Sequence, residues 1–353
     1  MNPLPIRTGR SALRIVAAII IVAAPVAAPA DTASPRLAQY WKPVDEAVDR
    51  ALDWLAKAQT GEGYFPGTHG RTTAVVALCG MAFLSKGYTP GHGRHGEALN
   101  KCIDYVLATQ RPEGTLYGRP GRGGMYSHCI STLLLSEVSG MVDPERQKKI
   151  DQALPKALKV ILAAQQVKKQ RDYQGGWRYK PTSRDSDISV SGWALMALRS
   201  ARLNGAPVPK QAIDDAVKFI MRCRMADGGF AYRPRSGSGV ARTGGALLCL
   251  ELSGHHGKKI ATQAGDYILK SFRRGRFLAR SHFHYALYYC SQGMFQLGDK
   301  YWEQFAEAMF KEMLKTQQAD GSWRGGSGGS AYATAMTVLA MTVTYRQLPI
   351  YQR

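Results

Sequence analysis

The sequence predicts an all-α protein that folds as a single α/α toroid of six helical hairpins. Three observations lead to this prediction. A unit of two helix-like runs around a glycine-containing turn recurs roughly every 45–60 residues along the chain. The first run of each unit is amphipathic, whereas the second is apolar nearly all round, as in a helix that is covered on both sides. Neither end of the array has a clear polar capping unit, so we expect the sixth hairpin to close on the first.

The sixth unit shows the pattern most clearly. A helix is expected over 302–315, then the turn Gln318-Ala-Asp-Gly-Ser-Trp323, then a second helix over 331–345. The five preceding units have the same order, with helix pairs expected at 44–57 and 71–86, 96–109 and 124–138, 147–166 and 188–202, 210–223 and 240–253, and 260–272 and 282–297. Glycine permits a left-handed backbone at the turn, and glutamine can bond to the free groups at helix ends. These turn residues are therefore expected to hold the repeats together.

Residues 1–30 have the features of a secretory signal peptide. Arg7, Arg10 and Arg14 precede an apolar run over 15–24, and Ala28-Pro29-Ala30 matches a small-residue cleavage site. The apolar run is too short to span a membrane comfortably. We expect an exported protein, periplasmic or extracellular, whose toroid domain covers 31–353 with repeats from about 44 to 345. The alternative is that the segment remains as an uncleaved anchor.

The chain is strongly basic, with a formal net charge of +21. The first 30 residues hold three arginines and no acid, so the remainder still carries +18. This charge favours an anionic lipid or glycan surface as partner. The basic residues are scattered and no nucleic-acid motif surrounds them, so nucleic acid is not the expected partner; the alternative is an ordinary solvated basic surface.

The six cysteines lie far apart inside apolar helix-like runs and show no CxxC or zinc-finger spacing. A chain of this length does not need disulfides to stabilise its core. We expect buried free thiols.

The turn motifs resemble those of a known superfamily. Gln318-Ala-Asp-Gly-Ser-Trp323 resembles the QW motif of squalene–hopene cyclases. Weaker versions resemble the variants in prenyltransferase β subunits: Gln59…Gly63-Tyr-Phe65, Gln166…Gly176-Trp177 and Gly228-Gly229-Phe230. The resemblance covers nearly the whole chain after the leader and implies a toroid with a central cavity. It does not select an activity, because similar toroids serve as cyclases, prenyltransferases, thioester domains and proteins without known catalysis.

In a closed toroid every second helix begins at the same end, so the residues just after each turn converge. The polar and aromatic residues at these positions are expected to line the central cavity; they are Tyr126, His128, Asp185, Asp187, Arg242, His282, His284, Tyr285 and Tyr332.

The stretch Asp185-Ser-Asp187-Ile188-Ser189 carries the candidate catalytic residues. It resembles the Asp-x-Asp-Asp motif of the cyclases, whose middle Asp protonates an alkene. The resemblance implies Asp187 as the acid and Asp185 as its companion. Ile188 stands where that motif has an adjacent Asp, which is a departure from it. The alternative is that Asp185, Asp187 and Ser189 cap the following helix.

The sequence also offers residues for two further kinds of site. Prenyltransferase β subunits bind zinc through Asp, Cys and His, and here Asp185 or Asp187 with His128, His282 and His284 would supply the ligands. His282 and His284 are two residues apart, so on a helix they point in different directions. The alternative is that His284 and Tyr285 form part of an aromatic wall. Arg242 and the basic loop at 273–280 fit a diphosphate or another anion, or else form solvated surface. No metal site is predicted.

The sequence therefore predicts an exported toroid that binds an apolar or extended ligand, such as an isoprenoid, or a protein partner with its central cavity. One alternative is a squalene-cyclase-like enzyme with Asp187 as acid, and another is a metal-dependent prenyltransferase-like enzyme. Prenyl transfer would need a separate α subunit and cytosolic substrates, which predicted export disfavours. A glycosidase would need a second acid, and none stands out. The chain has no GxSxG, P-loop or Gly-Cys-Gly-Glu-Gln motif, so cofactor and oligomeric state are both unspecified.

Overall fold

The computed structural model describes residues 35–117, 124–273, 282–326 and 328–351. Contacts divide the chain into the units Met1–Thr32 and Ala33–Arg353, and the described helices belong to the second unit. The predicted signal peptide at 1–30 and most of the basic loop at 273–280 lie outside the described residues.

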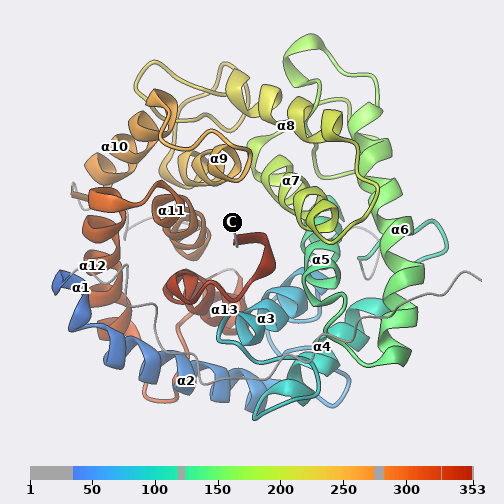
Figure 1. The fold of residues 1–353 in the computed structure, drawn as a ribbon, viewed down its shortest axis with the longest axis vertical. Helices are drawn as coiled ribbons and strands as arrows, with labels where there is room; N and C mark the ends of the chain where they lie inside the picture. The colour runs from blue at the N-terminus through green and yellow to red at the C-terminus, as the bar shows by residue number, and fades with distance from the viewer. Residues whose placement is uncertain (1–34, 118–123, 274–281, 327, 352–353) are drawn as a thin grey trace, which may run out of the picture. The chain divides into compact units, whose positions relative to one another are not determined.

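In this described part, helices alternate between an outer and an inner ring (Figure 1). The outer helices are α2 (Trp41–Ala58), α4 (Gly96–Ala108), α6 (Pro144–Gln166), α8 (Lys210–Arg222), α10 (Lys259–Arg273) and α12 (Asp299–Thr316). The inner helices are α3 (Thr73–Ser85), α5 (Gly124–Val138), α7 (Ile188–Leu203), α9 (Val240–Leu252), α11 (Phe283–Leu297) and α13 (Gly329–Met341). Short helical turns supplement them: α1 (Pro35–Ala38), η1 (Arg171–Tyr173), η2 (Val343–Tyr345) and η3 (Pro349–Tyr351). The predicted all-α toroid of six hairpins is confirmed.

The inner and outer helices differ in composition because neighbouring helices surround the inner ones, whereas the outer ones have one side exposed to solvent. All residues of the inner helix α3 except Ala74 are buried. In the outer helix α8, the buried residues Ala212, Ala216, Val217, Phe219 and Ile220 form one stripe, and the rest of the helix faces solvent. A helix that is apolar all round is stable in water only when neighbours cover every side, and the inner ring provides that cover.

A glutamine at the end of an outer helix ties successive hairpins together. Its side-chain amide donates to the carbonyl of the turn glycine and to a carbonyl of the next outer helix, over 2.7–3.3 Å. The residues are Gln59, Gln110, Gln165 and Gln317. Gln165 and Gln317 therefore fill the role that the sequence motif assigned to Gln166 and Gln318. Gln318 instead donates to the Thr316 carbonyl, because one step along the helix end turns the side chain away from the next outer helix.

The turn glycines are required by a close approach between hairpins. Each has a positive φ of 83–93°, and a Cβ there would lie 2.3–3.0 Å from a carbonyl oxygen of the next outer helix. The positions are Gly63, Gly114, Gly175, Gly228 and Gly321. Other residues would be strained by the backbone and would collide with that carbonyl.

The sixth hairpin closes on the first. The Gln317 side-chain amide donates to the Ala47 carbonyl of α2 over 2.7 Å, and Gly321 lies against the Arg50 carbonyl of the same helix. The inner helices α13 and α3 also pack together (Figure 1). These contacts repeat those between successive hairpins, so the ring has no open end.

The cysteines are unpaired and buried, as predicted: Cys79, Cys102, Cys129, Cys223, Cys249 and Cys290. Among the described helices, none is both long and apolar enough to cross a membrane.

Candidate acid and aromatic site

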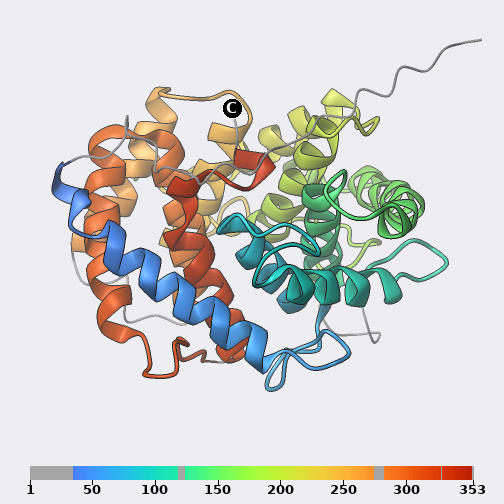
Figure 2. The ribbon, with the colours of Figure 1, turned by 60° about the horizontal axis from the view of Figure 1, so that its bottom comes forward.

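The inner helices begin at one end of the ring because each follows its outer helix with the same handedness. Figure 2 shows the α2–α3 and α12–α13 connections at the bottom of the view, whereas the red segment after α13 lies at the top. Asp187, Ser189, Tyr126 and Tyr285 lie close together at the beginning of α5, α7 and α11. This neighbourhood is the candidate site.

Asp187 is the fully buried N-cap residue of α7. Its Oδ1 accepts a hydrogen bond from the Val190 N–H over 2.9 Å. Its Oδ2 lies 3.6 Å from Arg178 Nε and accepts no hydrogen bond from the described residues. Burial raises the pKa of the Asp187 carboxyl to about 6, although the Val190 N–H and Arg178 both oppose this effect. One carboxyl thus combines a structural hydrogen bond on one oxygen with a second oxygen that is ion-paired with Arg178, and Tyr232 lies close enough to lower its pKa as well.

Asp185 has a different environment, although it is two residues away. Its side chain is 39% exposed and accepts a hydrogen bond from Arg178 Nη1 over 3.0 Å. Arg233 Nη1 lies 3.8 Å from the same oxygen. Two arginines therefore neutralise Asp185 at the rim, while Asp187 is enclosed.

Aromatic side chains surround the acid. Tyr126 and Tyr285 lie close enough to Asp187 for its charge to raise the pKa of each phenol, in addition to the larger effect of burial. The Tyr126 ring stacks on Tyr179, with centroids 5.8 Å apart. Tyr179 and Tyr232 are hydrogen-bonded through their hydroxyls. The acid therefore faces tyrosines from four different turns or helices.

Arg178, Tyr179 and Tyr232 belong to this site and were not predicted from the sequence. The Arg178 guanidinium lies 4.8 Å from the Tyr179 ring centroid and 5.6 Å from that of Tyr232. A signal for the tyrosines exists, since each is two residues after the turn aromatic, in Gly176-Trp177-Arg178-Tyr179 and Gly229-Phe230-Ala231-Tyr232. The backbone carbonyl of each tyrosine also accepts a hydrogen bond from the start of the preceding inner helix. The Met125 N–H donates to Tyr179 and the Ile188 N–H donates to Tyr232.

A continuous aromatic column leads from Asp187 into the ring. Tyr285 contacts Tyr289 with ring centroids 4.8 Å apart, and Tyr289 lies 5.4 Å from Trp193. Trp193 stacks on Tyr288 at 5.3 Å, and the Tyr288 and Tyr351 hydroxyls are hydrogen-bonded over 2.7 Å. We call this set the aromatic column: Tyr285, Tyr289, Trp193, Tyr288 and Tyr351. It packs between α7, α11 and η3, and all of its members except Tyr285 are buried.

His128 lies elsewhere than predicted. The Leu116 N–H donates to its Nδ1 and its Nε2 donates to the Ala157 carbonyl of α6, each over 3.0 Å. The ring is fully buried between the preceding turn and the outer helix, so it does not face the centre. Burial also lowers its pKa to about 4, which keeps the imidazole neutral.

The other predicted lining residues occupy varied positions. Tyr332 is partly buried at the start of α13 and close enough to Tyr285 to influence its pKa. Arg242 donates to the Ser238 carbonyl over 3.2 Å at the start of α9. His282 is exposed, with a left-handed backbone (φ 72°), immediately before α11. Tyr332 thus adjoins the acid site. Arg242 instead bonds to the backbone at the start of α9, and His282 is exposed in front of α11.

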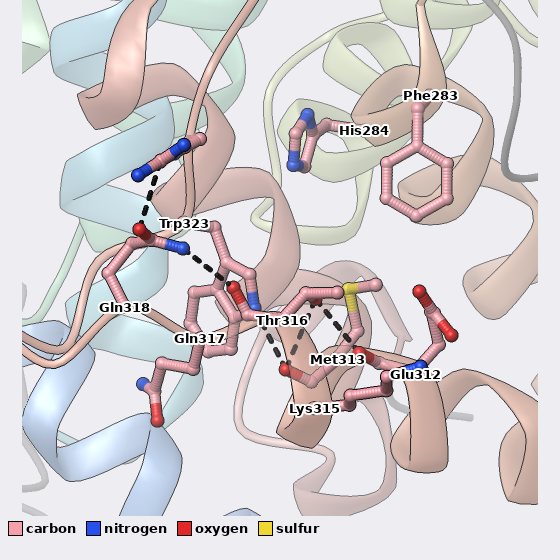
Figure 3. A pocket seen from close by; sticks show the side chains of 10 residues that line it. Phe283, His284, Glu312, Met313, Lys315, Thr316, Gln317, Gln318 and Trp323 are labelled. Atoms are coloured by element: carbon pink, nitrogen blue, oxygen red, sulfur yellow. Dashed lines mark hydrogen bonds between the residues drawn. The ribbon is translucent and has the colours of Figure 1, made fainter.

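His284 lines a cavity of about 400 Å³ between α11, the end of α12 and the turn that follows it. Figure 3 shows His284 and Phe283 on one side, facing Trp323, Gln318 and neighbouring residues on the other. Burial lowers the pKa of His284 to about 4. In the part of the chain that the structure covers, no three His, Cys, Asp or Glu side chains lie close enough together to hold a metal ion.

Comparison with known proteins identifies the fold family. The model of the prenyltransferase alpha-alpha toroid domain matches residues 8–201, 100–274 and 266–349. This protein belongs to the prenyltransferase alpha-alpha toroid family. Its repeat frame and closed ring are those that the family resemblance implied.

One curated relative is a drimenyl diphosphate synthase from Streptomyces showdoensis, which is 23% identical over 188 residues. The match covers 53% of this chain and 32% of the synthase, so the chain spans only about a third of that protein.

Solved toroids share the fold at low sequence identity. The type II terpene cyclase MstE from Scytonema is 16% identical, with a TM-score of 0.59 over 87% of this chain and all of that one. A variant of it was solved with the substrate geranylgeranyl dihydroxybenzoate and another with the product merosterolic acid A. A family 76 glycoside hydrolase from a bovine Bacteroides thetaiotaomicron strain is 9% identical, with a TM-score of 0.62 over 87% of this chain and 78% of that one.

Proposed function

We propose that this toroid binds an apolar isoprenoid ligand against the partly buried tyrosines at the starts of α5, α11 and α13, beside the buried carboxyl of Asp187. The observation that carries the proposal is a buried carboxyl, ion-paired with Arg178, beside aromatic rings that are only partly buried. Tyr126, Tyr285 and Tyr332 are only partly buried, so aromatic surface beside Asp187 remains available to a ligand. Removing such surface from water favours binding by about 25 cal/mol per Å².

The comparisons support the ligand class. The drimenyl diphosphate synthase and MstE, by name or by bound molecule, act on isoprenoid compounds. The basic rim around the site supports an anionic group on the ligand or an anionic lipid or glycan surface nearby, because Lys180 and Arg184 are exposed and Arg178 and Arg233 already hold Asp185. Export through residues 1–30 would place this binding outside the cytoplasm.

A second candidate function is proton transfer from Asp187 to an alkene. The position of Asp187 beside these tyrosines and a pKa near 6 favour it, because a protonated fraction of the carboxyl persists close to neutral pH. In this step the Asp187 O–H bond breaks, a C–H bond forms at one alkene carbon, and a carbocation and a carboxylate remain. Asp185 bonds to arginines instead of assisting, and the raised pKa makes Asp187 a weaker acid than an ordinary aspartic acid.

Asp187→Asn separates the two functions. Titration with farnesol and geranylgeraniol, followed by native mass spectrometry and product analysis, measures binding and turnover on the same samples. For a binding protein, we expect Asp187→Asn to bind within a few-fold of wild type, since the amide keeps the size and the N-cap oxygen. For an acid catalyst, we expect turnover by wild type and none by Asp187→Asn.

Asp185→Asn is the matched control, because it changes a carboxyl at the rim and leaves the buried one. Its binding and products should match those of wild type. Absence of binding to either alcohol by wild type would contradict the proposed function.

A further inference from the structure

The cavity beside α12 is separate from the Asp187 site. About 400 Å³ in volume, it lies between the start of α11, the C-terminal part of α12 and the turn that follows (Figure 3). Its lining includes Phe283 and His284 but neither Asp187 nor any of the tyrosines around that carboxyl. Its volume is within the range of small-molecule sites. It can therefore hold a ligand independently of the centre of the ring.

Glu312 provides a carboxylate at one side of this cavity (Figure 3). It is partly buried and, within the described residues, its side chain makes no ion pair or hydrogen bond. In contrast, Glu307 on the same helix is ion-paired with Arg36. A carboxylate that is partly removed from water without a partner loses free energy, and a cationic group on a ligand restores it.

Arg324 provides a guanidinium at another part of the wall. Its Nε donates to Gln318 Oε1 over 2.9 Å, and Gln318 Nε2 donates to the Thr316 carbonyl over 3.1 Å. Gln318 thereby holds the guanidinium in place, and the two Nη groups have no partner in the part of the chain that the structure describes. Figure 3 shows Gln318 across the cavity from Glu312. Such a guanidinium suits a carboxylate, and the exposed Lys315 adds a second positive charge to the lining.

Uncharged side chains form the rest of the wall. Phe283 is partly buried, and burial lowers the pKa of His284 to about 4, so its imidazole is neutral. Figure 3 shows both residues opposite Trp323. The Trp323 Nε1 donates to the Met313 carbonyl over 3.0 Å, so its indole has no further donor to offer. The middle of the cavity therefore favours an apolar group.

We propose that this cavity binds a small zwitterion whose ammonium and carboxylate are separated by an apolar spacer, as in an ω-amino acid or a dipeptide. The ammonium pairs with Glu312, the carboxylate pairs with Arg324, and the spacer lies against Phe283 and His284. Charges on opposite sides of the cavity favour such a ligand over an α-amino acid, whose two charged groups share one carbon atom. Binding here requires no ligand at Asp187.

Calorimetric titration of the full-length protein with 6-aminohexanoate, hexylamine and hexanoate tests the site. We expect wild type to bind the zwitterion about tenfold more tightly than either single-charge analogue, because each charged pair is worth roughly that factor. In Glu312→Gln the zwitterion should bind no better than hexanoate, and in Arg324→Gln no better than hexylamine. A general defect in folding weakens all three ligands alike, so it cannot produce this pattern.

Glu303→Gln and Lys311→Gln are matched controls, because both residues belong to α12 and lie outside the lining. Both variants should keep the wild-type affinities. Glycylglycine and 5-aminopentanoate have the same span, so tighter binding of one or the other supports the site and identifies its ligand as a peptide or an aliphatic amino acid. Equal affinity of wild type for 6-aminohexanoate and its single-charge analogues overturns the inference, as does the absence of binding to all of these zwitterions. Displacement of bound 6-aminohexanoate by farnesol would contradict a site separate from Asp187.

Discussion

At the scale of single residues, the second, third, fourth and sixth hairpins each satisfy one backbone N–H after the turn with a side chain of the inner helix. The turn N–H groups of Trp177, Phe230 and Trp323 donate to the hydroxyl oxygens of Ser191, Thr243 and Thr334, over 2.9–3.0 Å. In the second hairpin His128 takes this place and adds a bond to α6. A histidine that seemed a candidate for chemistry is thus part of the repeat frame.

His128→Ala should destabilise the protein by about 2–4 kcal/mol, because it leaves the Leu116 N–H and the Ala157 carbonyl without their partner and creates a cavity. His128→Thr restores an acceptor of the kind used in the other hairpins and should recover part of this loss. Urea unfolding of wild type, His128→Ala and His128→Thr measures these differences in the free energy of unfolding. Equal midpoints for wild type and His128→Ala would contradict the assigned role.

At the scale of elements, two buried carboxyls lie at helix ends and take different parts. Asp187 caps the start of α7, whereas Glu137 near the end of α5 holds η3. Burial raises the pKa of Glu137 to about 7, although the Ser200 hydroxyl and the Ile350 N–H oppose the shift. The phenols of Tyr288 and Tyr351 face the same carboxyl. The protonated form is therefore the one that the fold favours.

This shift predicts how Glu137 changes stability with pH. The folded pKa of about 7 exceeds the ordinary value of 4.5, so the folded state binds the proton more tightly than the unfolded chain. The contribution to the free energy of unfolding is full below pH 4.5 and is lost as pH rises towards 7, by about 3 kcal/mol in total.

Glu137→Gln cannot titrate. The unfolding free energy of wild type minus that of Glu137→Gln should therefore fall from pH 4.5 to 7 and then stay level. Measuring the difference cancels the opposite pH dependence of His128 and His284, whose lowered pKa values favour higher pH. Parallel stability curves for the two proteins would exclude a titrating Glu137.

At the scale of the whole toroid unit, closure makes its first and last hairpins neighbours. Gln317 crosses this seam with the same bonds that Gln110 makes between two successive hairpins. Both substitutions to alanine remove the two bonds donated by the side-chain amide, and Gln317→Ala also removes the bond that Arg50 of α2 donates to Gln317 Oε1 over 2.6 Å. The two substitutions act on different pairs of outer helices. The two substitutions should therefore destabilise different pairs of outer helices, and a measurement that resolves single helices can distinguish them.

Gln317→Ala should cost about 1–3 kcal/mol and accelerate amide hydrogen exchange in α2 and α12 together. Gln110→Ala, the matched control, should accelerate exchange in α4 and α6. Mass-spectrometric exchange resolves these helices. Faster exchange in α12 alone would show that the seam bond does not couple the two ends of the array.

The sequence by itself determined the architecture, because the hairpin repeat, the turn glycines and the all-apolar inner helices are local patterns that recur at each unit. It also placed Asp187, Tyr126, Tyr285 and Tyr332 at equivalent helix starts. The tertiary structure decided which of these positions adjoin one another, how Arg178 divides its bonds between Asp185 and Asp187, and that His128 faces outward. It alone brought Tyr351 onto Tyr288, 63 positions away along the chain. Such contacts depend on ring curvature and on side-chain rotation at a helix end, and neither is encoded by the repeat pattern.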